Sequence, residues 1–295
     1  MTDKLSGVFV PVITPFSNQR PDLEKLSFNI RKLNSSKVRG YMPLGSNGEF
    51  SHMNDEEQLS VLKTVKSNAS KEKVIIAGIA RNSAYSTIEF GKRAEEIGVD
   101  YMSVLTPSYY TSFMTDAALI KYYEAVADGL KTPVLLYNCP MYTAGISLSE
   151  EVIKTLSRHP NIHGMKDTLS GNLLKYIAAK GDADFEVMPG NINEFLMGLK
   201  AGSPGAVIAV SNYLPDECCT IQELFNEGKL NEAEKFSSEF INIIKNSAGK
   251  YAISGVKASC DLLGFKGGEV RNPLMDCTPE QRNTIRRVFS EAGYL

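Results

Sequence analysis

The sequence contains little histidine and no long apolar run. Its 295 residues include three histidines, which are His52, His159 and His163. They are too few, and in the wrong pattern, for a catalytic zinc site, which gathers several nitrogen or sulfur ligands. No apolar stretch reaches the length that crosses a membrane. A catalytic zinc centre and a membrane-spanning helix are therefore both disfavoured.

An excess of one charge is also lacking, because 32 basic and 34 acidic residues leave a net charge of -2. The chain therefore has no basic field that would indicate nucleic acid or an anionic membrane as partner. Residues 1–16 lack the charged, apolar and small-residue order of a signal peptide. The cysteines are odd in number and widely spaced, which predicts reduced thiols in a cytoplasmic protein. They are Cys139, Cys218, Cys219, Cys260 and Cys277.

What the sequence does contain is an alternation of short apolar segments with amphipathic ones. With 43% hydrophobic and 22% charged residues it has ample material for a core, and a single α/β barrel has this length. Eight segments are short, apolar and rich in β-branched or aromatic residues, as buried parallel strands are. They are residues 7–14, 40–45, 73–79, 101–107, 133–138, 162–167, 185–190 and 205–210.

Helix patterns lie between these strands and after them. Residues 54–68 open with Asn54 and Glu57 at capping-box spacing, a strong helix start. Eight strands with intervening helices favour a (β/α)8 (TIM) barrel over a doubly wound sheet, whose G-x-G-x-x-G turn is missing. We expect a barrel domain over residues 1–228 and a C-terminal helical extension over 229–295. The other expected helices are residues 83–97, 115–129, 148–158, 170–179, 215–227, 230–248, 250–263 and 279–291.

Chemistry in such barrels lies at the C-terminal ends of the strands. The second strand is followed by "GSNGEF" (45–50) and the fourth by "TPSYY" (106–110), while the fifth ends in "YNCP" (137–140). The sixth carries Lys166 in "NIHGMKDTLSG", and Tyr137 lies 29 residues before it, one βα unit away. Adjacent strands would bring the two side chains to the same mouth of the barrel.

A lysine in an apolar strand is costly unless it is paired or neutral. The amine attacks a carbonyl only when neutral, and at a pKa of ~10.4 roughly a thousandth of it is neutral near pH 7.4. Apolar burial lowers that pKa, and such lysines form Schiff bases with carbonyl substrates. In that case Tyr137 can relay protons to and from the carbinolamine.

Each of these features also has a purely structural interpretation. Lys166 can be an ion-paired residue, although strand alternation points the adjacent Asp167 to the opposite face. The "GSNGE" segment can be a simple turn or a cradle of backbone N–H groups for an anion. The "TPSYY" segment can supply core or interface aromatics. Their order, and their shared position at one end of the barrel, favour the functional interpretation.

At these residues the chain resembles the N-acetylneuraminate lyase/dihydrodipicolinate synthase family of pyruvate-dependent class I aldolases and lyases. The resemblance runs from about residue 6 to the C-terminus. Its motifs are "PVITPF", "GSNGE", the "YN-x-P" turn, "GMKD" and "GAVIAVSN". The resemblance implies a (β/α)8 barrel with a C-terminal helical extension, usually assembled as a homotetramer, and no metal or organic cofactor.

The resemblance also implies roles for particular residues. Lys166 would form the Schiff base with pyruvate or another 2-oxo acid, and Tyr137 would be the proton shuttle. Tyr110 matches a catalytic tyrosine that family members lend across a dimer interface. Ile208 matches an apolar position over the bound pyruvate. The turn that would hold the 2-oxo acid carboxylate consists of Gly45, Ser46, Asn47 and Gly48.

Two departures concern the substrate. Dihydrodipicolinate synthases usually have two threonines where this chain has Ser46 and Asn47, and an arginine where it has Tyr142, a further candidate substrate contact. The segments "GSNGEF", "TPSYY" and "RHPNIHGMKD" are similar to 4-hydroxy-2-oxoglutarate aldolases. We therefore expect cleavage of a 4-hydroxy-2-oxo acid, with dihydrodipicolinate synthase as first alternative and sialic acid lyase as second.

Two hypotheses from other classes remain. A non-catalytic binding or regulatory barrel would have lost the lysine or the tyrosine, and this chain has both. A metal-dependent class II aldolase needs a histidine cluster, which the sequence lacks. Activity that survives EDTA would separate the two classes of aldolase.

Overall fold

The computed structural model describes residues 2–295. Eight parallel strands alternate with helices along the chain and are followed by further helices, so that the protein is a (β/α)8 barrel with a helical C-terminal region. The elements belong to two compact units. The first consists of Met1–Gly7 and Val74–Val207, and the second of Val8–Lys73 and Ile208–Leu295.

The first unit contains five neighbouring parallel strands. They are β5 (Val74–Gly78), β6 (Tyr101–Leu105), β7 (Val134–Asn138), β8 (Ile162–Asp167) and β9 (Glu186–Pro189). Consecutive strands pair in this order. Every residue of β5, β6 and β7 is buried, which explains their continuous apolar sequences. The strand β10 (Gly205–Val207) completes the unit's strands.

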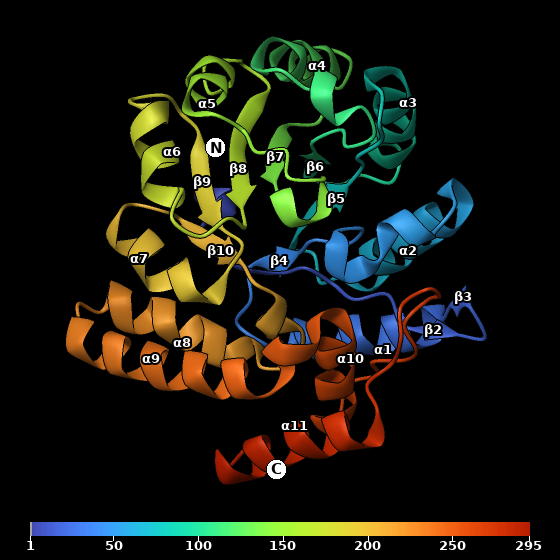
Figure 1. Ribbon diagram of the computed structural model, residues 1–295, viewed down its shortest axis with the longest axis vertical. Coiled ribbons are helices and arrows are strands. Elements are labelled where there is room, and N and C mark those ends of the chain that lie inside the picture. Colours follow the sequence, from blue (N-terminus) through green and yellow to red (C-terminus); the bar gives the residue numbers. More distant parts are fainter. Residues whose placement is uncertain (1) are drawn as a thin grey trace. The chain divides into compact units, whose positions relative to one another are not determined.

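Helices connect these strands and lie outside them (Figure 1). The first three follow the N-cap residues Ser83, Thr115 and Ser149, whose side chains accept the N–H three residues on and so satisfy an otherwise unpaired donor. The helices of the first unit are α3 (Ala84–Glu95), α4 (Asp116–Asp128), α5 (Glu150–Leu156), α6 (Leu173–Lys180) and α7 (Phe195–Lys200).

In the second unit the strands β1 (Gly7–Val10) and β4 (Gly40–Tyr41) are parallel neighbours. The short strands β2 (Phe16–Ser17) and β3 (Arg20–Pro21) form an antiparallel hairpin. The helices are α1 (Leu23–Asn34), α2 (Asp55–Asn68), α8 (Pro215–Asn226), α9 (Leu230–Asn246), α10 (Ala252–Leu262) and α11 (Pro279–Glu291).

Every expected strand is present, although most are shorter than the apolar segments that predicted them. The capping box of α2 is confirmed, since Asn54 and Glu57 exchange both hydrogen bonds. The structure adds α1, α7 and the β2–β3 hairpin to the expected elements. Within residues 2–295 no helix has the length and apolarity needed to cross a membrane. The domain boundary at 228/229 stays a prediction.

Candidate active site

Lys166 lies one residue before the end of β8, with 4% of its surface exposed. Its register partner on β7 is Tyr137, and the Lys166 Nζ atom lies 4.4 Å from the centre of the Tyr137 ring. Within residues 2–295 the amine has no hydrogen-bond or ion-pair partner. The structure therefore brings the two residues together and gives no support to an ion-paired structural lysine.

Burial determines the protonation of this amine. Removal from water disfavours the charged form and lowers the pKa of Lys166 to about 8 from the ordinary 10.5, although the nearby Cys139 opposes the shift. With that pKa about a tenth of the amine is neutral at pH 7. The face of the Tyr137 ring attracts the remaining cation. The amine is therefore placed to act as a nucleophile near neutral pH.

A buried polar network lies on the other face of the same two strands. Asn138 pairs with Asp167 in register, and its Nδ2 donates to Asp167 Oδ1 at 2.8 Å. Its Oδ1 accepts the Leu148 N–H at 3.0 Å, and the Tyr176 hydroxyl donates to the Leu148 carbonyl at 2.6 Å. Burial raises the pKa of Asp167 to about 6. These bonds hold β7 and β8 in the register that sets Tyr137 beside Lys166.

Asn138 and Tyr176 are not among the site residues predicted from the sequence. Strand alternation already places Asn138 and Asp167 on one face, opposite Tyr137 and Lys166. That pattern was the available signal for a polar pair behind the reactive one. Tyr176 comes from α6, and nothing in its local sequence marks it.

Gly190 follows β9 and leaves room for the alkyl chain of Lys166. A Cβ at this position would lie 2.7 Å from Lys166 Cε and 2.5 Å from Thr168 Cγ2. Its backbone N–H donates to the Asp167 carbonyl at 2.6 Å, so the backbone has little freedom to move away. A side chain at residue 190 would therefore displace the lysine.

If Lys166 forms the Schiff base that the family resemblance implies, Gly190→Ala should lower the rate of its formation by about tenfold or more, because overpacking forces side chains out of their rotamers. The measurement is borohydride trapping of pyruvate under single-turnover conditions. Gly171→Ala is the matched control for substituting a loop glycine, since a Cβ there meets nothing within 4 Å. Gly171 has a φ of 89°, so the control carries backbone strain without steric overlap. Equal trapping rates in Gly190→Ala and the wild type would contradict the role.

Two other predicted residues of the first unit lie on exposed loops. Tyr110 is 66% exposed and its ring packs edge-on against Tyr109, with 5.0 Å between centroids. Tyr142 ends a short 3-10 turn, Pro140–Tyr142, and is 55% exposed. Removal from water is the main cause that raises the pKa of Tyr142, and the nearby Cys139 adds to the shift. The structure thus leaves both tyrosines accessible to a partner or a substrate.

The predicted carboxylate-binding turn belongs to the second unit and follows β4. Ser46–Gly48 form a 3-10 turn that begins after Gly45. It is closed by two backbone hydrogen bonds, in which the Gly48 N–H donates to the Gly45 carbonyl and the Glu49 N–H donates to the Ser46 carbonyl. The turn is flanked by left-handed residues, with φ of 60° at Leu44 and 53° at Glu49. Such compact turns can expose consecutive N–H groups to an anion.

Ile208, the last predicted residue, follows β10 directly and is 1% exposed. Its N–H donates to the Phe9 carbonyl at 3.3 Å, and its carbonyl accepts the Ser211 hydroxyl at 2.6 Å. These bonds fix its backbone at the start of the Ala209–Asn212 turn.

A (β/α)8 barrel with a buried, partly neutral lysine at the end of a strand has the architecture of an enzyme that works through a lysine Schiff base. The family model described as "Dihydrodipicolinate synthetase family" matches residues 4–292. The chain belongs to this family, whose members are pyruvate-dependent class I aldolases and lyases.

Individual relatives differ in their named activities. The chain is 33% identical over 297 residues to "Probable 4-hydroxy-2-oxoglutarate aldolase, mitochondrial" of Emericella nidulans, covering 97% of this chain and 94% of that protein. It is 29% identical over 290 residues to the 4-hydroxy-tetrahydrodipicolinate synthase of Brachyspira hyodysenteriae, covering 97% of both.

Solved structures of similar fold are also found. A crystal structure of dihydrodipicolinate synthase (dapA) superimposes with a TM-score of 0.90 at 27% identity, covering 98% of this chain and 100% of that one. A catalytic lysine mutant of Ruminococcus gnavus sialic acid aldolase has a TM-score of 0.90 at 22% identity, covering 100% of this chain and 99% of that one, which indicates a shared fold.

Proposed function

We propose that this chain is an aldolase that cleaves or forms a 4-hydroxy-2-oxo acid, such as 4-hydroxy-2-oxoglutarate, through a Schiff base on Lys166. The observation that carries the proposal is the buried amine with a pKa of about 8 above the Tyr137 ring. The direct test is borohydride reduction in the presence of pyruvate, followed by assays with a panel of acceptor aldehydes. Absence of any covalent adduct would refute the proposal.

The proposed cleavage begins when neutral Nζ of Lys166 adds to the carbonyl carbon of the 2-oxo acid. Tyr137 carries a proton to the carbinolamine oxygen, and loss of water leaves a protonated imine. The bond between C3 and C4 then breaks as the 4-hydroxyl group gives its proton to the Tyr137 oxygen, which gave up its own in the previous step. The aldehyde leaves, and the bond electrons form an enamine. Protonation at C3 and addition of water release pyruvate and restore the amine.

The remaining residues have proposed roles in binding. Ser46 and Asn47, with the N–H groups of the turn between Gly45 and Gly48, would take the carboxylate of the 2-oxo acid. Ile208 would pack over the bound pyruvate moiety. The resemblance to the family supports these roles.

The substrate assignment rests on chain-specific departures and one relative. The Emericella nidulans relative bears the name of a 4-hydroxy-2-oxoglutarate aldolase. Tyr142 stands where the family's synthases supply arginine, and an arginine fork suits the carboxylate of aspartate semialdehyde. The alternative is 4-hydroxy-tetrahydrodipicolinate synthase, favoured by relatives of that name at 29% identity over 97% of the chain.

We expect kcat/KM for 4-hydroxy-2-oxoglutarate cleavage to exceed kcat/KM for condensation with aspartate semialdehyde. Loss of two charged hydrogen bonds at ~1.5–3 kcal/mol each corresponds to about a hundredfold or more in specificity. Both reactions would be measured on one preparation, by coupled pyruvate release and by formation of the dipicolinate-pathway product. A clear preference for aspartate semialdehyde would reverse the assignment.

If the absence of the synthases' arginine charge sets this preference, Tyr142→Arg should bring the two kcat/KM values closer together. Met141→Arg is the matched control, because it places the same charge one residue away. Met141 is also exposed, at 83%. The preference should narrow in Tyr142→Arg alone. An equal change in both variants would indicate a general effect of charge.

Assembly is a separate prediction. Tyr109, Tyr110, Phe113 and Met141 are 66% to 83% exposed, and aromatic residues and methionine are enriched at protein interfaces. We expect a homo-oligomer, a homotetramer built from two dimers in the pattern of the family. Sedimentation would measure the oligomeric state, and a fully active monomer at the assay concentration would reject this prediction.

A cytoplasmic location stays a prediction, and the Emericella nidulans relative is named as mitochondrial.

A further inference from the structure

Glu49 directly follows the Ser46–Gly48 turn and holds an unusual backbone conformation. Its φ of 53° lies in the left-handed region, which a residue with a Cβ keeps only where surrounding contacts hold it. The side chain is 1% exposed, and its Oε1 lies 2.5 Å from Lys257 Nζ. Its Oε2 accepts the backbone N–H of Arg271 at 2.9 Å. Glu49 therefore ties the end of the turn to two points of the C-terminal region.

Lys257 is as deeply buried as its partner. It belongs to α10, its side chain is 1% exposed, and its Nζ donates to the Glu269 carbonyl at 2.6 Å. The ammonium group also lies 4.7 Å from the centre of the Phe16 ring. Burial lowers the pKa of Lys257, and the attraction of Glu49 opposes that shift. Both charges thus depend on each other for compensation.

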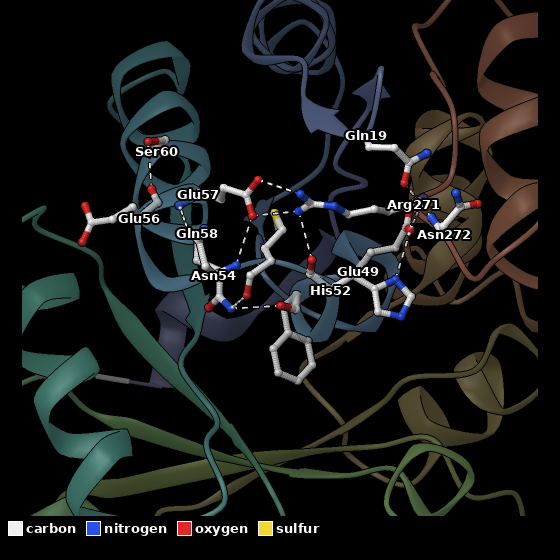
Figure 2. A network of polar contacts seen from close by, with 12 residues as sticks. Gln19, Glu49, His52, Asn54, Glu56, Glu57, Gln58, Ser60, Arg271 and Asn272 are labelled. Atoms are coloured by element: carbon white, nitrogen blue, oxygen red, sulfur yellow. Dashed lines mark hydrogen bonds and ion pairs between the residues drawn. The ribbon is translucent and has the colours of Figure 1, made fainter.

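Arg271 extends this network to the start of α2 (Figure 2). Its guanidinium group makes two parallel bonds to Glu57, at 2.7 and 2.8 Å, and a third to the His52 carbonyl at 2.9 Å. Figure 2 shows Glu49 and Glu57 on either side of the Arg271 side chain. The segment after the turn, Phe50–His52, is therefore held at both ends.

We propose that Glu49 and Lys257 are positioning residues for the 2-oxo acid carboxylate, because their buried pair holds the 45–48 turn in its binding shape. The inference rests on the function proposed above for Ser46 and Asn47. It assigns the C-terminal region, through α10 and the segment before Arg271, a part in substrate binding. Rigid support of this kind decides whether donors lie within binding distance of a ligand.

Stability alone does not account for such a pair. Burying two charges costs desolvation, and apolar side chains of similar volume often stabilise a protein as well or better. What an ion pair adds is a fixed geometry, and here that geometry is imposed on the residue that ends the turn. Removing both charges together should therefore leave the fold intact and loosen the turn.

The test compares Glu49→Gln, Lys257→Met and the double variant, because each single change leaves one buried charge without its partner. The first measurement is the pyruvate concentration that gives half-maximal borohydride trapping, together with the limiting trapping rate. The second is hydrogen exchange of the peptide that covers residues 44–53, which needs no substrate. Lys73→Met is the matched control, since Lys73 of the same unit bonds the Ser36 and Val38 carbonyls.

In the double variant we expect the half-saturating pyruvate concentration to rise by about tenfold or more, with a limiting rate within about threefold of the wild type. Residues 44–53 should exchange faster, and Lys73→Met should change neither quantity. An unchanged half-saturating concentration with unchanged exchange would overturn the inference, as would a fall in limiting rate alone. Wild-type protein that traps no 2-oxo acid would refute the proposed function, and exchange would still decide whether the pair holds the turn.

Discussion

Lys166→Met should abolish borohydride trapping of pyruvate and lower turnover by at least about 10⁴-fold, because no other group would supply the nucleophile. Methionine has a similar length and fits the apolar surroundings of β8. Mass spectrometry of the wild type should find the reduced adduct on the peptide that contains Lys166. An adduct on another lysine would contradict the assignment.

The matched control for this variant is Lys73→Met. Burial also lowers the pKa of Lys73, but its amine is bonded to two backbone carbonyls, so it should trap nothing. Lys73→Met should therefore keep full trapping. A loss of trapping in both variants would indicate a general effect of replacing a lysine withdrawn from water by methionine.

The stability of Lys166→Met has an expected sign. The pKa of Lys166 is about 8 in the folded protein and takes the ordinary value of 10.5 in the unfolded protein. Between those pH values the folded protein therefore binds fewer protons at this lysine than the unfolded protein does. The free energy of unfolding therefore rises with pH across that window, and the cost of burying the amine is greatest below pH 8. Methionine removes that cost, so the variant should melt no lower than the wild type at pH 7.

The strands and the reactive pair could be predicted from the sequence because each depends on a local pattern. Buried parallel strands need continuous apolar segments, and Lys166 follows Tyr137 by one βα unit. The hairpin at Asn18 and Gln19 could not be predicted in this way. Both residues have positive φ, 50° and 62°, and such two-residue turns are normally signalled by glycine.

The supporting network could not be predicted, because it joins residues that are distant in sequence. Glu49 and Lys257 are 208 positions apart, and nothing in either local sequence marks a buried ion pair. Asp167 meets Asn138 through the sheet, while Tyr176 reaches them from a helix. Side-chain hydrogen bonds of this kind depend on the packed structure, whereas strand periodicity does not.

Tyr137→Phe should cut turnover by at least about a hundredfold while the protein stays folded. General acid–base groups contribute ~10²–10⁴-fold, and the phenol is the group that the proposal uses at the carbinolamine oxygen. Phenylalanine keeps the ring beneath the Lys166 amine, 4.4 Å away in the wild type, so the surroundings of the nucleophile are largely preserved. The loss should therefore appear in the rates of adduct formation and turnover.

Tyr123→Phe is the matched control for this change. Tyr123 is a buried tyrosine of the same unit, and its hydroxyl donates to the Val104 carbonyl at 3.2 Å. Tyr123→Phe removes a buried tyrosine hydroxyl without affecting the proposed proton transfer. The variant should be less stable, because one neutral hydrogen bond contributes ~1 kcal/mol. Its turnover should stay within about threefold of the wild type. A Tyr137→Phe loss smaller than tenfold, or a loss matched by Tyr123→Phe, would remove Tyr137 from the proton-transfer step and leave it as the ring that holds Lys166.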